Sequence, residues 1–261
     1  MNKVKISAVI ITLNEEKKIQ ACIDSLKDVV DEIVVVDSFS TDQTKEICES
    51  NGVRFIQHAW PGYGAQKNWG NGQATYDCIL SLDADERLSN DLKKAILAIK
   101  EDWQYDIYSL NILTYLHDRA LKHCLYPDPH LRLFDKRKTK WKESKVHESI
   151  ITGPGITVKR IRKDILHYPN ENIHALVSTL NDNSTLWARG NFEAGKKPDI
   201  LKMVFSPTFA FVKTYIFKLG FLDGVFGFIT CLNMAHYRFL KYAKLIELSR
   251  VAGTDKKHGE C

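Results

Sequence analysis

Three acidic side chains occur within four residues in the run Asp83-Ala84-Asp85-Glu86. Carboxylates this close together repel one another and raise each other's pKa. A divalent cation resolves this conflict, and oxygen ligands suit Mg²⁺ or Mn²⁺, which in proteins usually also bind substrate phosphates. Acidic residues also favour the N-terminus of a helix, which Ser89 and Asn90 could cap. The run therefore predicts either a phosphate-associated metal site or the start of a helix.

Polar side chains follow three predicted strands in the N-terminal half of the chain. Short apolar runs predict these strands over residues 6–12, 33–36 and 78–82. Helical patterns separate the runs, and such alternation is typical of a parallel sheet covered by helices. Ligands bind sheets of this kind outside the carboxyl ends of the strands. Because Asn14, Asp37 and Asp83 lie at or just after strand ends, we expect them to gather along one edge.

The chain as a whole is predicted to be an α/β protein with a C-terminal helical region. Further strands are expected over residues 107–113 and 131–134, and helical spacing of apolar residues begins at Ile173. We therefore expect a domain with a mostly parallel central sheet over residues 1–170. A helical region is expected over residues 171–252, and a disordered tail over residues 253–261.

Composition and charge narrow the class of protein. The chain has 261 residues, of which 44% are hydrophobic, and a mild net charge of +5, with both signs interspersed in the first half. A nucleic-acid groove is therefore not predicted. The six cysteines form no Cys-x-x-Cys pair, which indicates reduced thiols. Residues 1–12 are too short for a signal peptide, so a cytoplasmic setting is expected.

The segment from residue 200 to 248 is rich in Phe, Tyr, Leu and Ile. No uninterrupted apolar run in it reaches the roughly 18 residues that a membrane-spanning helix needs. Two amphipathic helices around residues 220–224 are predicted instead, lying in a membrane interface with their lysines toward anionic headgroups. An ordinary helical subdomain or a dimer interface is the alternative. Charged residues interrupt the segment, among them Lys213, Lys218, Asp223, Arg238 and Lys241.

Three segments, taken together, are similar to one enzyme family. They are Ala8 to Glu16, Val34 to Thr44 and Asp83-Ala84-Asp85, in this order along the chain. With them the chain resembles glycosyltransferase family 2, whose D-x-D motif the last segment matches. The resemblance covers roughly residues 4–150 and implies a GT-A fold that binds a nucleotide sugar. Later segments resemble the branch that decorates lipopolysaccharide cores; they are residues 64–68, 130–134, 141–148, 167–168 and 220–227.

The resemblance implies roles in donor binding for individual residues. Asp85 is expected to bind Mg²⁺ or Mn²⁺ together with the donor diphosphate, and Asp83 to contact the ribose, a metal-bound water or the metal. Asp37 would accept a hydrogen bond from the nucleobase, although many family members have a second aspartate where this chain has Ser38. The other expected donor contacts are Thr12, Asn14, Glu15, Lys67, Ala84 and Arg132.

For some of these residues a purely structural interpretation stays open. Asn14 and Glu15 suit the start of a helix, where a short polar side chain caps the backbone and an acid favours the first turn. Lys67 would equally suit the solvated face of a helix, and Arg132 a structural ion pair.

Glu148 is the candidate general base implied by the resemblance, because a carboxylate beside a partly desolvated sugar can have its pKa raised toward neutrality. His147 is an alternative base or an orienting partner. The structural alternative is a surface glutamate paired with Lys142 or Lys145.

The reaction implied by the resemblance is a single displacement that inverts the anomeric carbon. One sugar, glucose from UDP-glucose, would move to a heptose of a lipid-linked lipopolysaccharide or lipooligosaccharide core at the cytoplasmic face of the inner membrane. The Q-x-x-R-W signature of processive synthases is absent, which favours the addition of one sugar. A nucleotidyltransferase and a non-catalytic membrane-bound nucleotide-sugar-binding protein are the competing hypotheses.

Overall fold

The computed structural model describes residues 3–143 and 149–258, with side chains described up to Val251. The chain forms two compact units. The first comprises Met1–Leu113 and Pro127–His167, and the second comprises Thr114–Tyr126 and Tyr168–Cys261. The second unit therefore includes residues 114–126, which the sequence pattern placed with the first domain.

The described residues contain one mixed sheet with the strand order β3-β2-β1-β4-β8-β6-β9-β5, and β7 pairs with β6. The strands are β1 (Ile6–Thr12), β2 (Glu32–Asp37), β3 (Arg54–Gln57), β4 (Cys78–Asp83), β5 (Glu86–Leu88), β6 (Ile107–Leu116), β7 (Arg119–Ala120), β8 (Asp128–Asp135) and β9 (Val158–Asn170). The predicted α/β fold class is confirmed. Strands β3, β2, β1 and β4 pair in parallel, whereas β8 pairs antiparallel with both β4 and β6. The connection from β6 to β8 holds no helix, and parallel neighbours need such a crossover.

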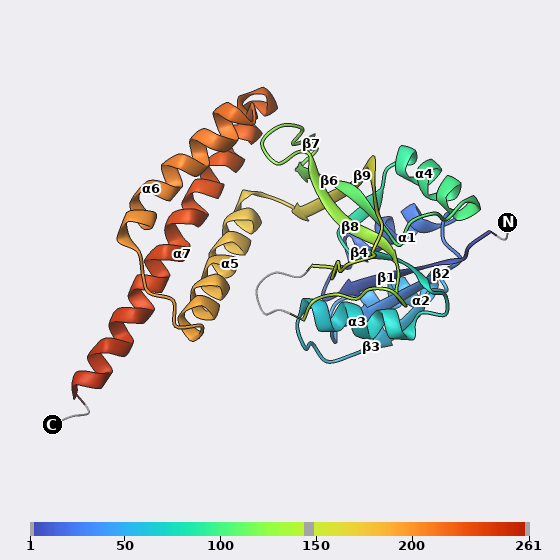
Figure 1. Cartoon of the computed structure of the whole chain (residues 1–261), viewed down its shortest axis with the longest axis horizontal. Helices are drawn as coiled ribbons and strands as arrows, with labels where there is room; N and C mark the ends of the chain where they lie inside the picture. The colour runs from blue at the N-terminus through green and yellow to red at the C-terminus, as the bar shows by residue number, and fades with distance from the viewer. Residues whose placement is uncertain (1–2, 144–148, 259–261) are drawn as a thin grey trace. The chain divides into compact units, whose positions relative to one another are not determined.

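Helices cover both faces of the parallel half of the sheet. They are α1 (Ile19–Leu26), α2 (Thr44–Ser50), α3 (Tyr63–Gln73) and α4 (Asn90–Glu101). Side chains alternate between the faces of a strand, so Ala8 and Ile10 pack with residues of α1, α2 and α4. Val9 and Ile11 point to the other face, where Trp69 of α3 and Trp141 pack. Helix α3 lies along β1 and β2 (Figure 1). All seven residues of β1 are buried, which explains its continuous apolar run.

Two of the predicted helix starts have different outcomes. Helix α1 begins at Ile19, so Asn14 does not cap it and Glu15 does not lie in its first turn. The Asn14 side chain instead accepts a hydrogen bond from the backbone of the next loop, at Thr41. Ser89 does cap α4, because its hydroxyl accepts from the Leu92 N–H at 3.2 Å. The acidic run lies at the end of β4, in the turn and at the start of β5, and α4 begins only at Asn90, so the helix-start interpretation of that run is wrong.

The second unit is mainly helical. It contains α5 (Ile173–Glu193), α6 (Ile200–Phe211), a π-helical segment η1 (Val212–Phe217), a 3-10 turn η2 (Gly220–Asp223) and α7 (Gly224–His258). Helix α7 packs against both α5 and α6 (Figure 1). The tail was predicted to be disordered from residue 253, but α7 continues to His258. A glycine inside a helix costs only about 1 kcal/mol, too little for Gly253 to end a long helix.

Asp223 holds residues 122–124 against the helices of this unit. Its carboxylate accepts hydrogen bonds from three consecutive backbone N–H groups, those of Lys122, His123 and Cys124, at 2.9, 3.0 and 2.9 Å. The ring of His123 adds a further contact at 2.7 Å. These bonds explain why a segment between two strands belongs to the helical unit.

Among the described residues, one helical stretch is long and apolar enough to cross a membrane. It runs from Ile200 to Phe217, with a mean hydropathy of 1.3 and 11% of its residues buried. This stretch still agrees with the expectation from the sequence that no uninterrupted apolar run of this length occurs here. Lys202 and Lys213 interrupt the stretch, which is why it is not an uninterrupted apolar run.

Candidate active site

The carboxyl ends of β1, β2 and β4 meet at one edge of the parallel half of the sheet (Figure 1). In the register of these strands Thr12 lies opposite Asp37, and Ile11 lies opposite Asp83. The structure therefore brings Thr12, Asp37 and Asp83 to a common edge, as the alternation of strands and helices led us to expect.

The loops that follow β1 and β2 are tied together by hydrogen bonds. The Asn14 N–H donates to the Ser40 hydroxyl at 2.8 Å, and the Thr41 N–H donates to the Asn14 side-chain carbonyl at 2.8 Å. The Glu15 N–H donates to the Thr44 hydroxyl at 2.9 Å. Asn14 has a φ of 54°, a left-handed conformation that asparagine tolerates better than most residues. Asn14 and Glu15 thus shape the loops beside the strand ends.

Asp37 is fully buried at the end of β2. Its carboxylate accepts hydrogen bonds from the Ser40 N–H at 2.9 Å, from the Ser40 hydroxyl, and from the Gln57 side-chain amide at 3.2 Å. These bonds hold the loop after β2 in place. The direct contact with a nucleobase predicted for Asp37 stays a prediction, and the geometry adds a structural role for this residue.

Asp83 lies at the centre of a buried network of charges. The Lys67 ammonium lies 3.0 Å from one of its carboxylate oxygens, and an Arg132 nitrogen donates to the other at 3.2 Å. The same Arg132 nitrogen donates to Glu86 at 2.7 Å, and Glu86 accepts from the Asp83 N–H at 2.8 Å. Burial would raise the pKa of Asp83, but Lys67 and Arg132 outweigh it and hold that pKa well below its ordinary value. Burial raises the pKa of Glu86 despite the attraction of Arg132.

Lys67 belongs to this network instead of to the surface. Its side chain is only 1% exposed, and its ammonium lies over the Trp141 ring at 4.7 Å from the ring centroid. The interpretation of Lys67 as a solvated helix lysine is therefore wrong. Arg132 is likewise buried, and its ion pairs with Asp83 and Glu86 are of the structural kind that the sequence left open.

Asp85 has a different environment from Asp83. It lies in the turn between β4 and β5 and contacts the His167 ring nitrogen Nε2 at 3.4 Å. Burial lowers the pKa of His167, but the hydrogen bond and the charge of Asp85 outweigh it, so the pKa is raised. Burial is the main cause that raises the pKa of Glu15; Lys18 opposes it, and the charge of Asp85 adds to it. Asp85 therefore faces the loop after β1 as well as β9.

Ala84 is buried in the core beneath this turn. Its methyl group is therefore not available to a ligand, and the donor contact predicted for Ala84 stays a prediction. Any contact from this position falls to its backbone.

Glu148 and His147, the candidate bases, lie outside the described residues. The chain just before them is fixed to α3. The Asn68 side chain donates to the Trp141 carbonyl at 2.9 Å and accepts from the Trp141 N–H at 2.9 Å. Gly64 approaches the same segment so closely that a Cβ atom there would lie 2.3 Å from the Lys142 carbonyl oxygen. Gly64 and Asn68 of α3 thus hold the segment that begins at Trp141. Lys67 of the same helix pairs with Asp83.

Two residues of the site were not singled out by the sequence pattern. Glu86 is buried beside Arg132, and its membership of the acidic run was the signal that could have identified it. Gln66 links α3 to the strand ends, because its amide donates to the Ser38 hydroxyl at 3.1 Å and contacts His58 at 2.7 Å. No local signal distinguishes this buried glutamine from an exposed one.

The sequence profile of Glycosyl transferase family 2 matches residues 7–161 of this chain, which is more than half of its length. The chain belongs to glycosyltransferase family 2. It is 32% identical over 256 residues to an uncharacterized glycosyltransferase of Rickettsia bellii, which covers 94% of this chain and 87% of the relative. It is 31% identical over 258 residues to the lipopolysaccharide core biosynthesis glycosyltransferase LpsC of Rhizobium meliloti, with coverage of 94% and 93%.

Two solved structures are also similar to this glycosyltransferase. S. aureus TarS 1-349 is 18% identical, with coverage of 96% of this chain and 92% of that chain and a TM-score of 0.47. Glucosyl-3-phosphoglycerate synthase from Mycobacterium tuberculosis, crystallised with Mn²⁺, UDP and phosphoglyceric acid, is 26% identical. That match covers 42% of this chain and 43% of the other, with a TM-score of 0.36.

The donor atoms of the glycosyltransferase limit how a divalent cation can bind. No group of three or more His, Cys, Asp or Glu side chains in the described part of the chain is arranged to hold a metal. Lys67 and Arg132 already neutralise Asp83, so a second cation at its oxygens would be repelled. Asp85, 16% exposed and paired with no Lys or Arg within 4 Å among the described residues, fits a cation that takes its other ligands from a substrate diphosphate. The surroundings therefore favour Asp85 over Asp83 as the ligand, and the cation itself stays a prediction.

Proposed function

We propose that this glycosyltransferase transfers one hexose, glucose from UDP-glucose, to a heptose of a lipid-linked lipopolysaccharide core at the cytoplasmic face of the inner membrane. The similarity to LpsC carries the proposal, because it extends over 94% of this chain and 93% of LpsC. The buried acids at the strand ends support it, since they lie where α/β sheets bind ligands. The identities of the donor sugar and of the acceptor sugar are both part of this proposal.

The donor would bind across the ends of β1, β2 and β4. Thr12 and the loops shaped by Asn14 and Asp37 are proposed to hold the base and ribose. Asp85 would hold Mg²⁺ or Mn²⁺ with the donor diphosphate, and the ion, when bound, would neutralise charge on the leaving group. Lys67 and Arg132 are proposed to fix Asp83 in place, so that its backbone directs the turn that carries Asp85.

The proposed chemistry is a single displacement. The acceptor hydroxyl oxygen forms a bond to the anomeric carbon on the side opposite the diphosphate, while the bond from that carbon to the diphosphate oxygen breaks. Glu148 accepts the proton of the hydroxyl, and UDP leaves with the electron pair of the broken bond. No covalent sugar–enzyme intermediate is needed, and the anomeric configuration inverts.

We expect Glu148→Gln to reduce turnover by about 100- to 10,000-fold while the Kd for UDP-glucose changes by less than about threefold. The amide keeps the shape of the carboxylate but cannot accept the proton. Calorimetry with UDP-glucose and an assay of UDP release give the two values. Glu143→Gln, in the same segment and exposed, is the matched control. Normal turnover by Glu148→Gln would remove this residue as the base and leave His147 as the candidate.

Thr12→Val is expected to weaken UDP binding about tenfold without loss of folding stability. The Thr12 hydroxyl is buried at the end of β1 and has no hydrogen-bond partner among the described residues. Its desolvation is therefore uncompensated unless a ligand supplies a partner. Thr139→Val is the matched contrast, because the Thr139 hydroxyl donates to the Ile151 carbonyl, so stability should fall while UDP binding holds. Unchanged UDP affinity in Thr12→Val would place the donor elsewhere.

The reaction itself is tested with purified protein, a panel of nucleotide sugars, Mn²⁺ and core oligosaccharides that end in heptose. Mass spectrometry should show the addition of one hexose with UDP-glucose and none with GDP-mannose, and NMR of the product should show inverted configuration. Transfer from another UDP-sugar would correct the donor. Release of diphosphate from UTP together with a sugar 1-phosphate would instead support a nucleotidyltransferase, and binding without turnover a non-catalytic sensor.

A further inference from the structure

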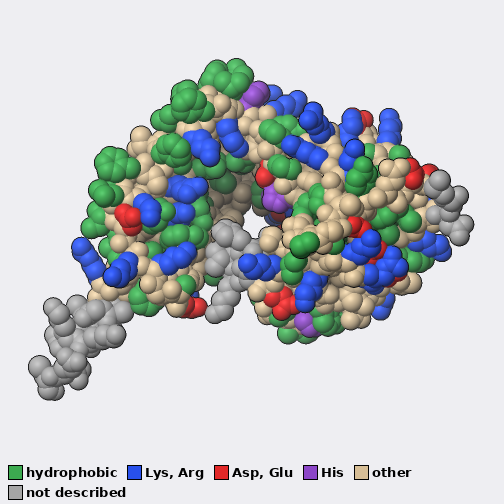
Figure 2. All heavy atoms as spheres, viewed as in Figure 1, with side chains coloured by type: hydrophobic (Ala, Val, Ile, Leu, Met, Phe, Trp, Pro, Cys, Tyr) green, Lys and Arg blue, Asp and Glu red, His purple; other side chains and the backbone are tan. Residues whose placement is uncertain are grey.

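One side of helix α6 and the segment η1 carries a row of exposed apolar side chains. Leu201, Phe205 and Phe209 are 70, 66 and 67% exposed, and Phe217, two turns further on, is 77% exposed. A spacing of four residues places side chains on the same side of a helix. We name this surface the α6 face; its apolar residues are Leu201, Val204, Phe205, Phe209, Ile216 and Phe217. Hydrophobic side chains gather along the α6 edge of the helical unit in Figure 2.

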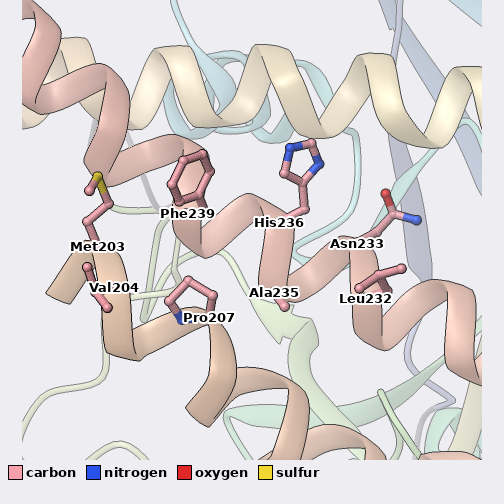
Figure 3. A pocket seen from close by; sticks show the side chains of 8 residues that line it. All are labelled: Met203, Val204, Pro207, Leu232, Asn233, Ala235, His236 and Phe239. Atoms are coloured by element: carbon pink, nitrogen blue, oxygen red, sulfur yellow. The ribbon is translucent and has the colours of Figure 1, made fainter.

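A groove between α6 and α7 adjoins the α6 face. Met203, Val204 and Pro207 line it from α6, and Leu232 and Phe239 line it from α7 (Figure 3). Its volume is about 670 Å³, within the range of sites that hold small molecules. Val204 belongs both to the groove and to the α6 face, so the two form one apolar surface.

Lysines outnumber acids among the charges beside this surface. Lys202 lies among Leu201, Phe205 and Phe209, with which it lines a second shallow hollow, and Lys213 lies one turn after Phe209. The acid at this end of α6, Asp199, caps the helix and pairs with Lys202 at 3.1 Å. The other nearby acid of the described helices α6 to η2 is Asp223, which is 3% exposed and holds residues 122–124. An apolar surface bordered by exposed lysines complements an anionic bilayer.

We propose that the α6 face inserts among the headgroups and upper acyl chains of an anionic bilayer, with the groove between α6 and α7 taking part of an acyl chain. This inference rests on the membrane location in the proposed function and names the surface that provides it. A second copy of the chain is a poorer occupant, because pairing two α6 faces would bring lysines of like charge together. A spanning α6 is also disfavoured, because Lys202 and Lys213 would enter hydrocarbon while α7 stayed packed along one side.

Flotation with vesicles of phosphatidylethanolamine and phosphatidylglycerol tests the proposal, and pure phosphatidylcholine vesicles serve as the neutral probe. Phe205→Ser combined with Phe209→Ser is expected to lower the bound fraction on anionic vesicles at least about tenfold. Lys213→Glu combined with Lys218→Glu should lower it about fivefold or more, and high salt should do the same to the unmodified protein. These side chains are exposed, so the variants should fold. Leu97→Ser and Lys94→Glu, on exposed positions of α4, are the matched controls and should bind normally.

Several outcomes would overturn the proposal. One is unchanged flotation of the variant that combines Phe205→Ser with Phe209→Ser. Another is a dimer, detected by light scattering, that this variant converts to monomers while its binding to vesicles persists. Retention on vesicles after both high salt and alkaline carbonate would indicate a spanning helix. The variants should still transfer sugar to a lipid-free core oligosaccharide. Variants that lose vesicle binding but still transfer sugar would support the inference. If the unmodified protein binds vesicles normally but transfers no sugar, that result would count against the proposed function alone.

Discussion

Asp85→Asn is expected to lower the rate of sugar transfer by at least about 100-fold. Among the acids of the run, Asp83 and Glu86 are neutralised by buried basic side chains. The Asp85 carboxylate instead contacts the His167 ring at 3.4 Å. The asparagine keeps the shape of the turn but removes the negative charge that would hold a divalent cation. An assay of UDP release with Mn²⁺ measures the loss.

Electron paramagnetic resonance of Mn²⁺ provides a readout of Asp85 that does not depend on turnover. In the presence of UDP the unmodified protein should bind Mn²⁺, and Asp85→Asn should bind it at least about tenfold more weakly. Asp91→Asn, at an exposed aspartate paired with Lys163 at the start of α4, is the matched control. Normal Mn²⁺ binding by Asp85→Asn would show that the cation, if used, has other ligands.

Arg132→Met is expected to lower the free energy of unfolding of the protein by about 3–5 kcal/mol. The Arg132 side chain is 6% exposed and pairs with the buried Glu86 and the partly buried Asp83, so its removal leaves both carboxylates without that partner, while Lys67 still pairs with Asp83. Urea unfolding followed by tryptophan fluorescence measures the change. Lys163→Met is the control: the Lys163 and Asp91 side chains are 46 and 66% exposed, so their ion pair should contribute at most about 1 kcal/mol.

A double-mutant cycle separates the network from a general packing defect. Glu86→Gln removes one of the two charges that Arg132 compensates, so the Arg132→Met and Glu86→Gln combination should be less destabilised than the sum of the single variants. A coupling free energy of at least about 1 kcal/mol is expected. Strict additivity would mean that Arg132 stabilises the fold by packing and not by its charge.

The parallel half of the sheet was predictable because its signals are local. The seven residues of β1 are all buried, so their apolar run has the same bounds in the sequence as in the structure. The antiparallel half was less predictable, because the partners of β8 and β9 depend on how the chain returns after irregular connections. The placement of residues 114–126 in the helical unit could not be foreseen, since it depends on Asp223, about a hundred residues away along the chain.

The sequence by itself determined the chemistry that is possible at the site. It placed acids, an asparagine and a threonine at the ends of three strands, and the physical reason is that strand periodicity and strand ends are properties of neighbouring residues. Only the tertiary structure decided which acid keeps its charge available. Lys67 comes from α3 and Arg132 from β8, and together they neutralise Asp83, whereas Asp85 pairs with no Lys or Arg within 4 Å among the described residues. Charge compensation acts over a few ångströms in space, whatever the separation along the chain, so no local pattern could reveal it.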